Sequence, residues 1–165
     1  VFNNAGYGLA GAFEGATDEQ LQTQLNTNLL GVMRVTQAFL PALRAQKSGT
    51  ILTTTSIGGL ATFPFNSVYH ATKWGLEGWS ESLAYELAPF GIRVVALNPV
   101  AGETPLLKTF MGEDTPEMRA KFLATIPIGR FSTPEDLGNA ACFLCSDEAS
   151  MITGVCMEVD GGRCI

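Results

Sequence analysis

The sequence predicts an α/β fold built on a parallel sheet, and three observations carry this prediction. Short apolar runs of strand type recur along the 165 residues, each bounded by glycine or polar residues. Longer segments with apolar residues three or four apart alternate with them, which is typical of amphipathic helices. The strand runs are continuously apolar, which indicates strands buried on both faces. Strands that alternate with helices in this way favour a parallel sheet.

The first half of the sequence contains one expected long helix and one expected strand. Thr17 and Gln20 form a capping box, a signal for the beginning of a helix. Apolar residues at helical spacing follow it, so we expect a helix over about 21–46. A strand is expected over 50–55, directly after a glycine.

The second half repeats this alternation. A helix is expected over about 68–87, and strands are expected over 92–97 and 155–159. A third helix should begin at Pro134, because proline is favoured at the first helical position. The stretch 99–127 is rich in proline, glycine and charge. We expect a long connection there with one helix inside it, of the kind that often covers a ligand.

Length and composition limit the class of function. The chain has 165 residues, 46% of them hydrophobic, and a net charge of −6, which fits one globular domain over residues 1–165. A mildly acidic chain is poorly suited to nucleic acid or an anionic membrane surface, and no apolar run reaches the ~18 residues of a membrane span. We therefore expect a cytoplasmic protein that acts on a small molecule, with neither nucleic acid nor membrane as partner.

Four cysteines raise the question of a metal or redox site. Cys142 and Cys145 form a C-x-x-C pair, whereas Cys156 and Cys164 stand alone. The pair falls in an apolar helical run, no second C-x-x-C exists, and His70 is the only histidine. We predict no metal site and interpret the thiols as small buried core residues in a reducing compartment.

Residues 6–11 match G-x-G-x-x-G, the pattern of dinucleotide-binding turns. That pattern requires a preceding strand, an immediate helix and an acidic residue about 20 positions later. Here only two residues precede Asn3, Gly15 interrupts the stretch that follows, and residues 25–31 contain no acid. We interpret the match as a flexible loop.

A catalytic constellation is predicted around Tyr69 and Lys73. The two are four residues apart and share one face of the expected helix. An ammonium beside a phenol lowers the tyrosine pKa, and such a tyrosine can exchange a proton with an alcohol oxygen. Ser56 follows the strand 50–55, at the end where parallel sheets bind ligands. The structural alternatives are a solvated helix face for the pair and a turn cap for Ser56.

Further motifs accompany this constellation in a fixed order. They are Asn3-Asn4-Ala5-Gly6, Asn28-Leu29-Leu30-Gly31, Ser56, Tyr69-x-x-x-Lys73, Asn98-Pro99 with Thr104, a Gly-Arg-x-x-x-Pro-Glu-Asp segment over 129–136, and Val159-Asp160-Gly161-Gly162. In this order and spacing they resemble the motifs of short-chain dehydrogenases/reductases, over nearly the whole chain. The resemblance implies a Rossmann-like doubly wound parallel sheet and an oxidoreductase that uses NAD or NADP to interconvert a secondary alcohol and a ketone by hydride transfer.

The resemblance also implies roles for individual residues. Tyr69 would be the general acid/base, Lys73 would lower its pKa and hold the nicotinamide ribose, and Ser56 would orient the carbonyl. Asn28 would kink its helix and hold a water linked to Lys73; the alternative is a helix-interior amide bonded to nearby backbone. For Asn4 and Gly6 the structural alternative to cofactor binding is a turn that ends a strand, and for Thr104 it is a helix cap. The implied cofactor-binding set is Asn4, Gly6, Tyr69, Lys73, Pro99, Gly102 and Thr104.

The chain departs from the family's pattern in two places. Pro99 is followed by Val100 where the family usually has glycine, so we expect a locally different backbone beside the nicotinamide. The family's T-G-x-x-x-G-x-G turn, its first βαβ portion and the residue that selects NAD or NADP would precede Val1. We therefore expect a single partial domain lacking this portion, with weak cofactor binding, little turnover on its own and an exposed sheet edge at Asn3 and Asn4.

The expected substrate is an uncharged or partly apolar alcohol or ketone, bound by residues 61–66 and 106–122. The structural alternative is that the apolar side chains of these two segments only close the hydrophobic core. The two long helices carry apolar residues on more than one face, and the resemblance implies a homodimer or homotetramer. Two other functions stay open. One is a catalytically silent scaffold that acts as an interaction module, and the other is a different α/β enzyme such as a hydrolase, although no G-x-S-x-G is present.

Overall fold

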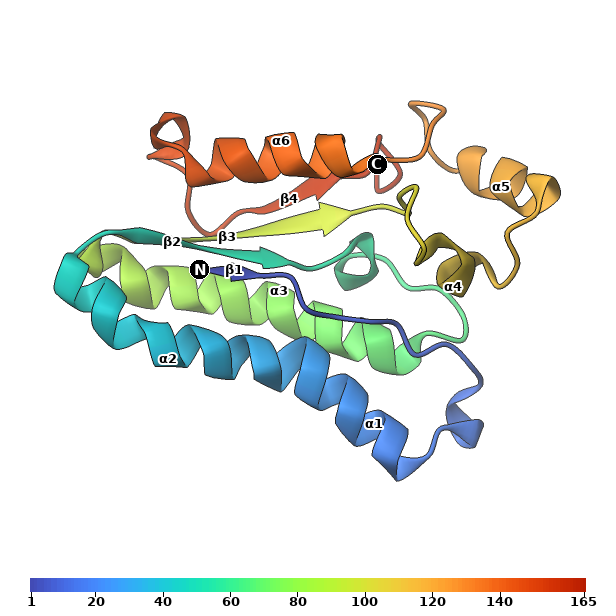
Figure 1. Cartoon of the computed structure of the whole chain (residues 1–165), viewed down its shortest axis with the longest axis horizontal. Coiled ribbons are helices and arrows are strands. Elements are labelled where there is room, and N and C mark those ends of the chain that lie inside the picture. Colours follow the sequence, from blue (N-terminus) through green and yellow to red (C-terminus); the bar gives the residue numbers. More distant parts are fainter.

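A four-stranded parallel sheet forms the centre of the molecule, in a computed structural model that describes residues 1–165. The strands, in sheet order, are β1 (Phe2–Asn3), β2 (Gly49–Thr54), β3 (Ile92–Pro99) and β4 (Cys156–Val159). The helices are α1 (Asp18–Leu25), α2 (Gly31–Gln46), α3 (Ser67–Leu87), α4 (Leu107–Met111), α5 (Pro116–Leu123) and α6 (Pro134–Cys145). Figure 1 shows α1, α2 and α3 on one face of the sheet and α6 on the other. This arrangement confirms the predicted doubly wound α/β class.

The two central strands bury their side chains alternately on the two faces. Ile51 and Val94 pack in a cluster with α3, whereas Leu52 and Val95 pack on the other face with Leu144 of α6. Successive side chains of a strand point to opposite faces, so a strand covered on both sides must be apolar throughout. The prediction of burial on both faces is confirmed for β2 and β3. The edge strand β4 is only partly buried.

The predicted helix over 21–46 is present, but it changes its winding in the middle. The capping box closes as expected: the Thr17 hydroxyl accepts from the Gln20 backbone N–H at 3.2 Å, and the Gln20 side chain accepts from the Thr17 N–H at 2.9 Å. Between α1 and α2 lies a π-helical turn, η2 (Asn26–Leu30), in which the Gly31 N–H bonds back to the Asn26 carbonyl.

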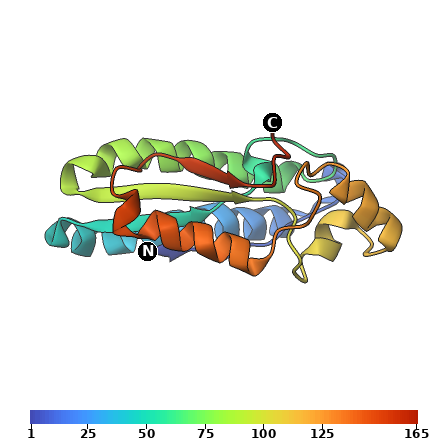
Figure 2. The same ribbon diagram turned by 90° about the horizontal axis from the view of Figure 1, so that it is seen from above.

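The long connection after β3 contains two short helices, α4 and α5, where one was expected. Each begins and ends within the stretch 99–127, and Thr115 caps α5 through its hydroxyl. Figures 1 and 2 show both helices beyond the carboxyl ends of the strands. They close a third hydrophobic cluster, which comprises Ile57, Val100, Leu107, Met111, Ile126 and Phe131.

The prediction that the cysteines are buried is wrong. Cys142 and Cys145 are exposed, because they are three residues apart and share the outer face of α6, while Leu144 and Ala141 take the core-facing positions. Cys164 is exposed, Cys156 is half-buried, and all four are free thiols.

None of the helices combines the length and the apolar character that crossing a membrane would require.

Candidate active site

A cavity of about 680 Å³ opens at the carboxyl ends of the parallel strands. Its walls come from the segments that follow β1, β2, β3 and β4, and from α3, α4 and α5. Ligands of open α/β sheets bind at this edge. The predicted site residues that line the cavity are Asn4, Gly6, Ser56, Tyr69, Lys73, Pro99, Gly102 and Thr104.

Ser56 and Tyr69 meet across a glycine-rich turn. Ser56 caps a short 3-10 helix, η3 (Ile57–Gly59), by accepting from the Gly58 N–H at 3.0 Å. A Cβ on Gly58 would lie 3.0 Å from the Tyr69 ring and 3.3 Å from the Ser56 hydroxyl. The absence of a side chain at this position therefore lets both groups approach the cavity together. Ser56 is a turn cap, as the structural alternative proposed, and it also lines the cavity.

The electrostatics of Tyr69 differ from the prediction. Burial raises the pKa of this phenol, and only a hydrogen bond with Ser56 opposes the rise. The Lys73 Nζ lies 5.7 Å from the ring centroid and donates to the Thr54 carbonyl, so burial outweighs the lowering of the Tyr69 pKa that was expected from this ammonium. With a raised pKa, Tyr69 is a neutral phenol at neutral pH and therefore a proton donor.

Lys73 is a buried cation with spare hydrogen-bonding capacity. Its side chain is 6% exposed, and burial lowers its pKa to about 8 despite the opposing charge of Glu77. Its one hydrogen bond within the protein goes to the Thr54 carbonyl at 2.9 Å. An ammonium has three N–H groups, so two remain for a ligand.

Asn28 lies beneath the cavity and holds one of its walls. Its amide accepts from the Tyr7 N–H at 3.1 Å and donates to the Tyr7 carbonyl at 2.8 Å. Gln24, one turn earlier, donates to the same carbonyl at 2.9 Å and accepts from the Leu9 N–H at 2.7 Å. The two buried amides thus fix the loop after β1. The structural alternative for Asn28 was a bond to nearby backbone, whereas the observed partner, Tyr7, is distant in the sequence. Sequence reasoning missed Gln24, although two amides four residues apart were a usable signal.

His70, also missed as a site residue, holds the loop that follows η3. Its Nε2 accepts from the Phe63 N–H at 2.8 Å, so its Nδ1 carries the proton and donates to the Gly58 carbonyl at 2.7 Å. The His70 ring packs between Phe63 and Tyr69, with centroid distances of 5.3 and 6.1 Å.

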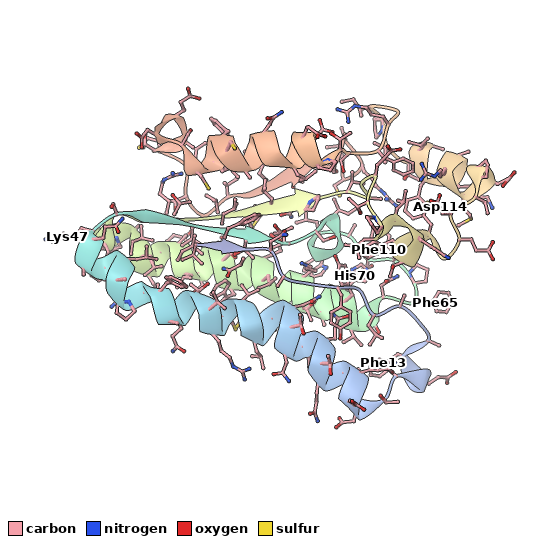
Figure 3. All side chains as sticks on the ribbon, in the orientation of Figure 1. Phe13, Lys47, Phe65, His70, Phe110 and Asp114 are labelled. Carbon is pink, nitrogen blue, oxygen red and sulfur yellow. The ribbon has the colours of Figure 1, made fainter.

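The predicted substrate segments line the cavity only in part. Phe63 and Phe110 do so, and the Phe110 ring packs 5.5 Å from that of Tyr69. Phe65 is 66% exposed and points away from the strands (Figure 3), whereas Met111 is buried in the adjoining core cluster. The cavity also receives Arg163, which the sequence analysis did not single out. Its position just past the last parallel strand was the available signal.

Comparisons with known proteins agree with this architecture. A family model described as enoyl-(acyl carrier protein) reductase matches residues 1–163. The 4-formylbenzenesulfonate dehydrogenase of Comamonas testosteroni is 41% identical over 89% of this chain and 59% of its own length. A 3-ketoacyl-(acyl-carrier-protein) reductase from Brucella melitensis, solved with NADH, superposes with a TM-score of 0.92 at 44% identity, covering 99% of this chain and 66% of that one.

A second solved structure has the same arrangement. It is described as a putative NAD(P)-dependent gluconate 5-dehydrogenase from Beutenbergia cavernae with bound NADP, and it gives a TM-score of 0.93 at 33% identity over 98% of this chain and 64% of that one. The chain thus spans 59% to 66% of the length of these proteins. The match over almost every residue shows that the chain belongs to the short-chain dehydrogenase/reductase family.

Proposed function

We propose that the protein carrying this chain is an NAD- or NADP-dependent oxidoreductase that interconverts a secondary alcohol and a ketone by hydride transfer. The observation that supports the proposal most directly is the presence of Ser56, Tyr69 and Lys73 in one cavity at the carboxyl edge of the sheet. The NADH and NADP in the two related structures support the cofactor class.

The cavity has features that fit the nicotinamide end of such a cofactor. A Cβ on Gly6 would lie 3.9 Å from the Lys73 Nζ, so glycine at this position leaves the ammonium accessible to ribose hydroxyls. The Ser132 hydroxyl lines the same cavity, is buried and has no hydrogen-bond partner in the protein. We propose that the residues that hold the nicotinamide and its ribose are Asn4, Gly6, Tyr69, Lys73, Pro99, Gly102 and Thr104. When bound there, the nicotinamide would supply or accept the hydride.

Ser56, Tyr69 and Lys73 would bring about the transfer of the proton to and from the substrate oxygen. In the reducing direction, the Ser56 hydroxyl and the Tyr69 phenol donate hydrogen bonds to the ketone oxygen. As that oxygen gains negative charge, Tyr69 gives up its proton and becomes a phenolate, which the charge on Lys73 stabilises. In the oxidising direction the phenolate takes the proton back. Asn28 acts through the Tyr7 backbone by holding the cavity wall, and we propose that it also holds a water linked to Lys73.

Tyr69→Phe tests this proposal. We expect turnover to fall by about 10²–10⁴-fold, because the ring stays in place while the proton donor is lost. Tyr85→Phe is the matched control, since Tyr85 lies on the same helix and is 76% exposed. Both variants are assayed for ketone reduction with NADH and NADPH, and their folds are compared by circular dichroism. Near-normal turnover of Tyr69→Phe would overturn the assignment.

We also propose that the protein assembles as a homodimer or homotetramer through its long helices. Large apolar side chains remain exposed there, among them Val35 and Phe39 on α2 and Trp74 on α3. Exposed apolar surface on neighbouring helices favours association. Residues 1–165 would form part of a single domain of each subunit, in the cytoplasm, where the free thiols stay reduced. Light scattering at micromolar concentration checks the assembly, and a monomeric mass would contradict it.

A further inference from the structure

Arg163 enters the cavity from the turn that follows β4. Gly161 and Gly162 both have positive φ angles, of 65° and 86°, and reverse the chain here. The Asp160 carboxylate fixes the turn by accepting from the backbone N–H groups of Gly162 and Cys164, at 2.9 and 2.7 Å. The Arg163 side chain is thus held at the cavity by a structured turn.

The Arg163 guanidinium lies between two aromatic rings of the cavity wall. Its central carbon is 5.1 Å from the ring centroid of Phe63 and 5.1 Å from that of Phe122. Arginine above an aromatic face is an attractive contact, yet it leaves the N–H groups of the guanidinium without acceptors.

Within residues 1–165, no anion is paired with this cation. Arg119 and Arg130 form ion pairs with carboxylates, whereas Arg163 forms neither an ion pair nor a hydrogen bond through its side chain. The nearby Asp160 uses its two oxygens for backbone N–H groups. Burial lowers the pKa of Arg163, although the nearby Asp160 carboxylate opposes this, so the site penalises the unpaired charge. A partly buried guanidinium of this kind is stabilised by an incoming anion.

We propose that the substrate is a ketone or alcohol with a carboxylate or sulfonate group, and that Arg163 binds this group. The inference rests on the proposed oxidoreductase function and replaces the expected uncharged substrate with an anionic one. A guanidinium suits such a group because its planar N–H fork bonds two oxygens at once.

The wall between Arg163 and Tyr69 places the anion away from the reacting carbon. Phe63 touches Arg163 on one side and His70 on the other, and His70 in turn packs against Tyr69. In this proposal the charged group lies beside Phe63, in the part of the cavity that Arg163 lines, while the reacting carbon lies beside Tyr69. The rings of Phe63 and Phe110 would contact the apolar body of the substrate in between.

The test compares ketones that differ only in charge. The first pair is 4-acetylbenzoate and its methyl ester, and the second, more extended pair is 7-oxooctanoate and its methyl ester. Binding of each ketone to the protein saturated with NAD⁺ or NADP⁺, which carry no hydride to transfer, is measured by calorimetry, so that no turnover accompanies binding. We expect at least one acid to bind at least tenfold more tightly than its ester, and Arg163→Gln to abolish this preference while changing ester binding less than twofold.

Two further variants isolate the chemistry. Arg163→Lys keeps the charge but loses the fork, so it should retain only part of the preference. Arg44→Gln is the matched control, because Arg44 lies over the Phe90 ring at 4.4 Å and outside the cavity. It should leave all four affinities unchanged. NADH and NADPH are also titrated alone, because a cofactor phosphate is the other anion that Arg163 could bind. Arg163→Gln should bind both cofactors as tightly as the unmodified protein does. A loss of cofactor affinity as large as the loss of acid affinity would overturn the inference.

Reduction of both ketone pairs, measured in parallel, separates this inference from the proposed function. An Arg163-dependent preference without Tyr69-dependent reduction would support the anion site and overturn the oxidoreductase proposal. Tyr69-dependent reduction without charge preference in either pair would overturn the anion site and leave the oxidoreductase proposal standing. Absence of binding by both acids also counts against Arg163.

Discussion

Two cationic side chains, Arg93 and Lys73, lie at opposite ends of the sheet, and they differ in how many hydrogen bonds they make within the structure. At the amino end of β3, the Arg93 guanidinium donates to the carbonyls of Leu144 at 2.7 Å and Ala149 at 3.0 Å, with further bonds to the same region. At the carboxyl end, the Lys73 ammonium has the Thr54 carbonyl as its one partner. Arg93 holds the end of α6 in place, whereas Lys73 keeps N–H groups for a ligand.

The polar groups around the two cations follow the same division. Near the amino ends of the strands, Ile51, Leu87 and Ile92 form a dry cluster. At the carboxyl ends, Asn66 Oδ1 and Ser132 Oγ are buried without partners in residues that line the cavity, whereas Glu77, Ser80 and Asn98 carry such atoms outside it. Unsatisfied buried groups cost stability and are retained where a ligand uses them. The comparison therefore contrasts an apolar cluster that stabilises the fold with a cavity whose lining keeps polar groups available for a ligand.

Lys73→Met should have the largest effect, because it should lower turnover and raise stability at the same time. We expect turnover to fall by at least about 100-fold, because the charge that stabilises the Tyr69 phenolate is lost. We also expect the free energy of unfolding to rise by about 1–3 kcal/mol, because an ammonium with one hydrogen bond is replaced by an apolar side chain of similar length. Chemical denaturation and steady-state assays measure the two effects, with exposed Lys121→Met as the control. A variant that is both inactive and less stable would show that Lys73 is chiefly structural.

Arg93→Met should have the opposite pattern. Loss of its bonds to carbonyls at the end of α6 should lower the free energy of unfolding by about 2–3 kcal/mol, since hydrogen bonds from charged groups are the stronger ones. The kcat of the protein that remains folded should be unchanged. Urea denaturation gives the first quantity, and Arg34→Met, an exposed substitution on α2, is the control. A fall in kcat with stability preserved would mean that the two ends of the sheet are coupled.

The dependence of stability on pH offers a smaller test. The pKa of Lys73 is lowered from 10.5 to about 8 in the folded state, so between these values the unfolded chain binds more protons than the folded one. This group's contribution therefore favours folding more as pH rises through that window. The stability advantage of Lys73→Met should shrink by roughly 2 kcal/mol between pH 7 and pH 10 in the cofactor-free protein. Parallel stability curves would contradict the assignment of this pKa.

Local pattern predicted much of the fold and part of the site. Continuous apolar runs identified the strands because those strands are covered on both faces. The spacing of Tyr69 and Lys73 predicted a shared helix face, and the position of Ser56 after β2 predicted the edge at which it would meet them. These inferences needed only periodicity and the rule that ligands bind at the carboxyl ends of parallel strands.

The features that were missed depend on contacts between distant segments. Gln24 bonds to the loop after β1, and Arg163 contacts one ring from a loop and one from α5, so neither contact can be read from the neighbouring sequence. The pKa of Tyr69 depends on how deeply the ring is buried, which the spacing to Lys73 does not reveal. The C-x-x-C pair was assigned to the core because its helix is apolar, although only one face of that helix is covered.

The π-helical turn η2 sets the rotational phase of α1 relative to α2. The widened turn brings the Asn26 carbonyl so close that a Cβ on Gly31 would lie 2.9 Å from its oxygen, which explains the glycine in the Asn28-Leu29-Leu30-Gly31 motif. Deleting one residue here would restore ordinary α-helical winding and rotate α1 by about 100°. Gln24 would then swing off the loop after β1 while Asn28 could stay. A single extra residue thus sets the angle at which two amides, Gln24 and Asn28, reach the backbone of Tyr7.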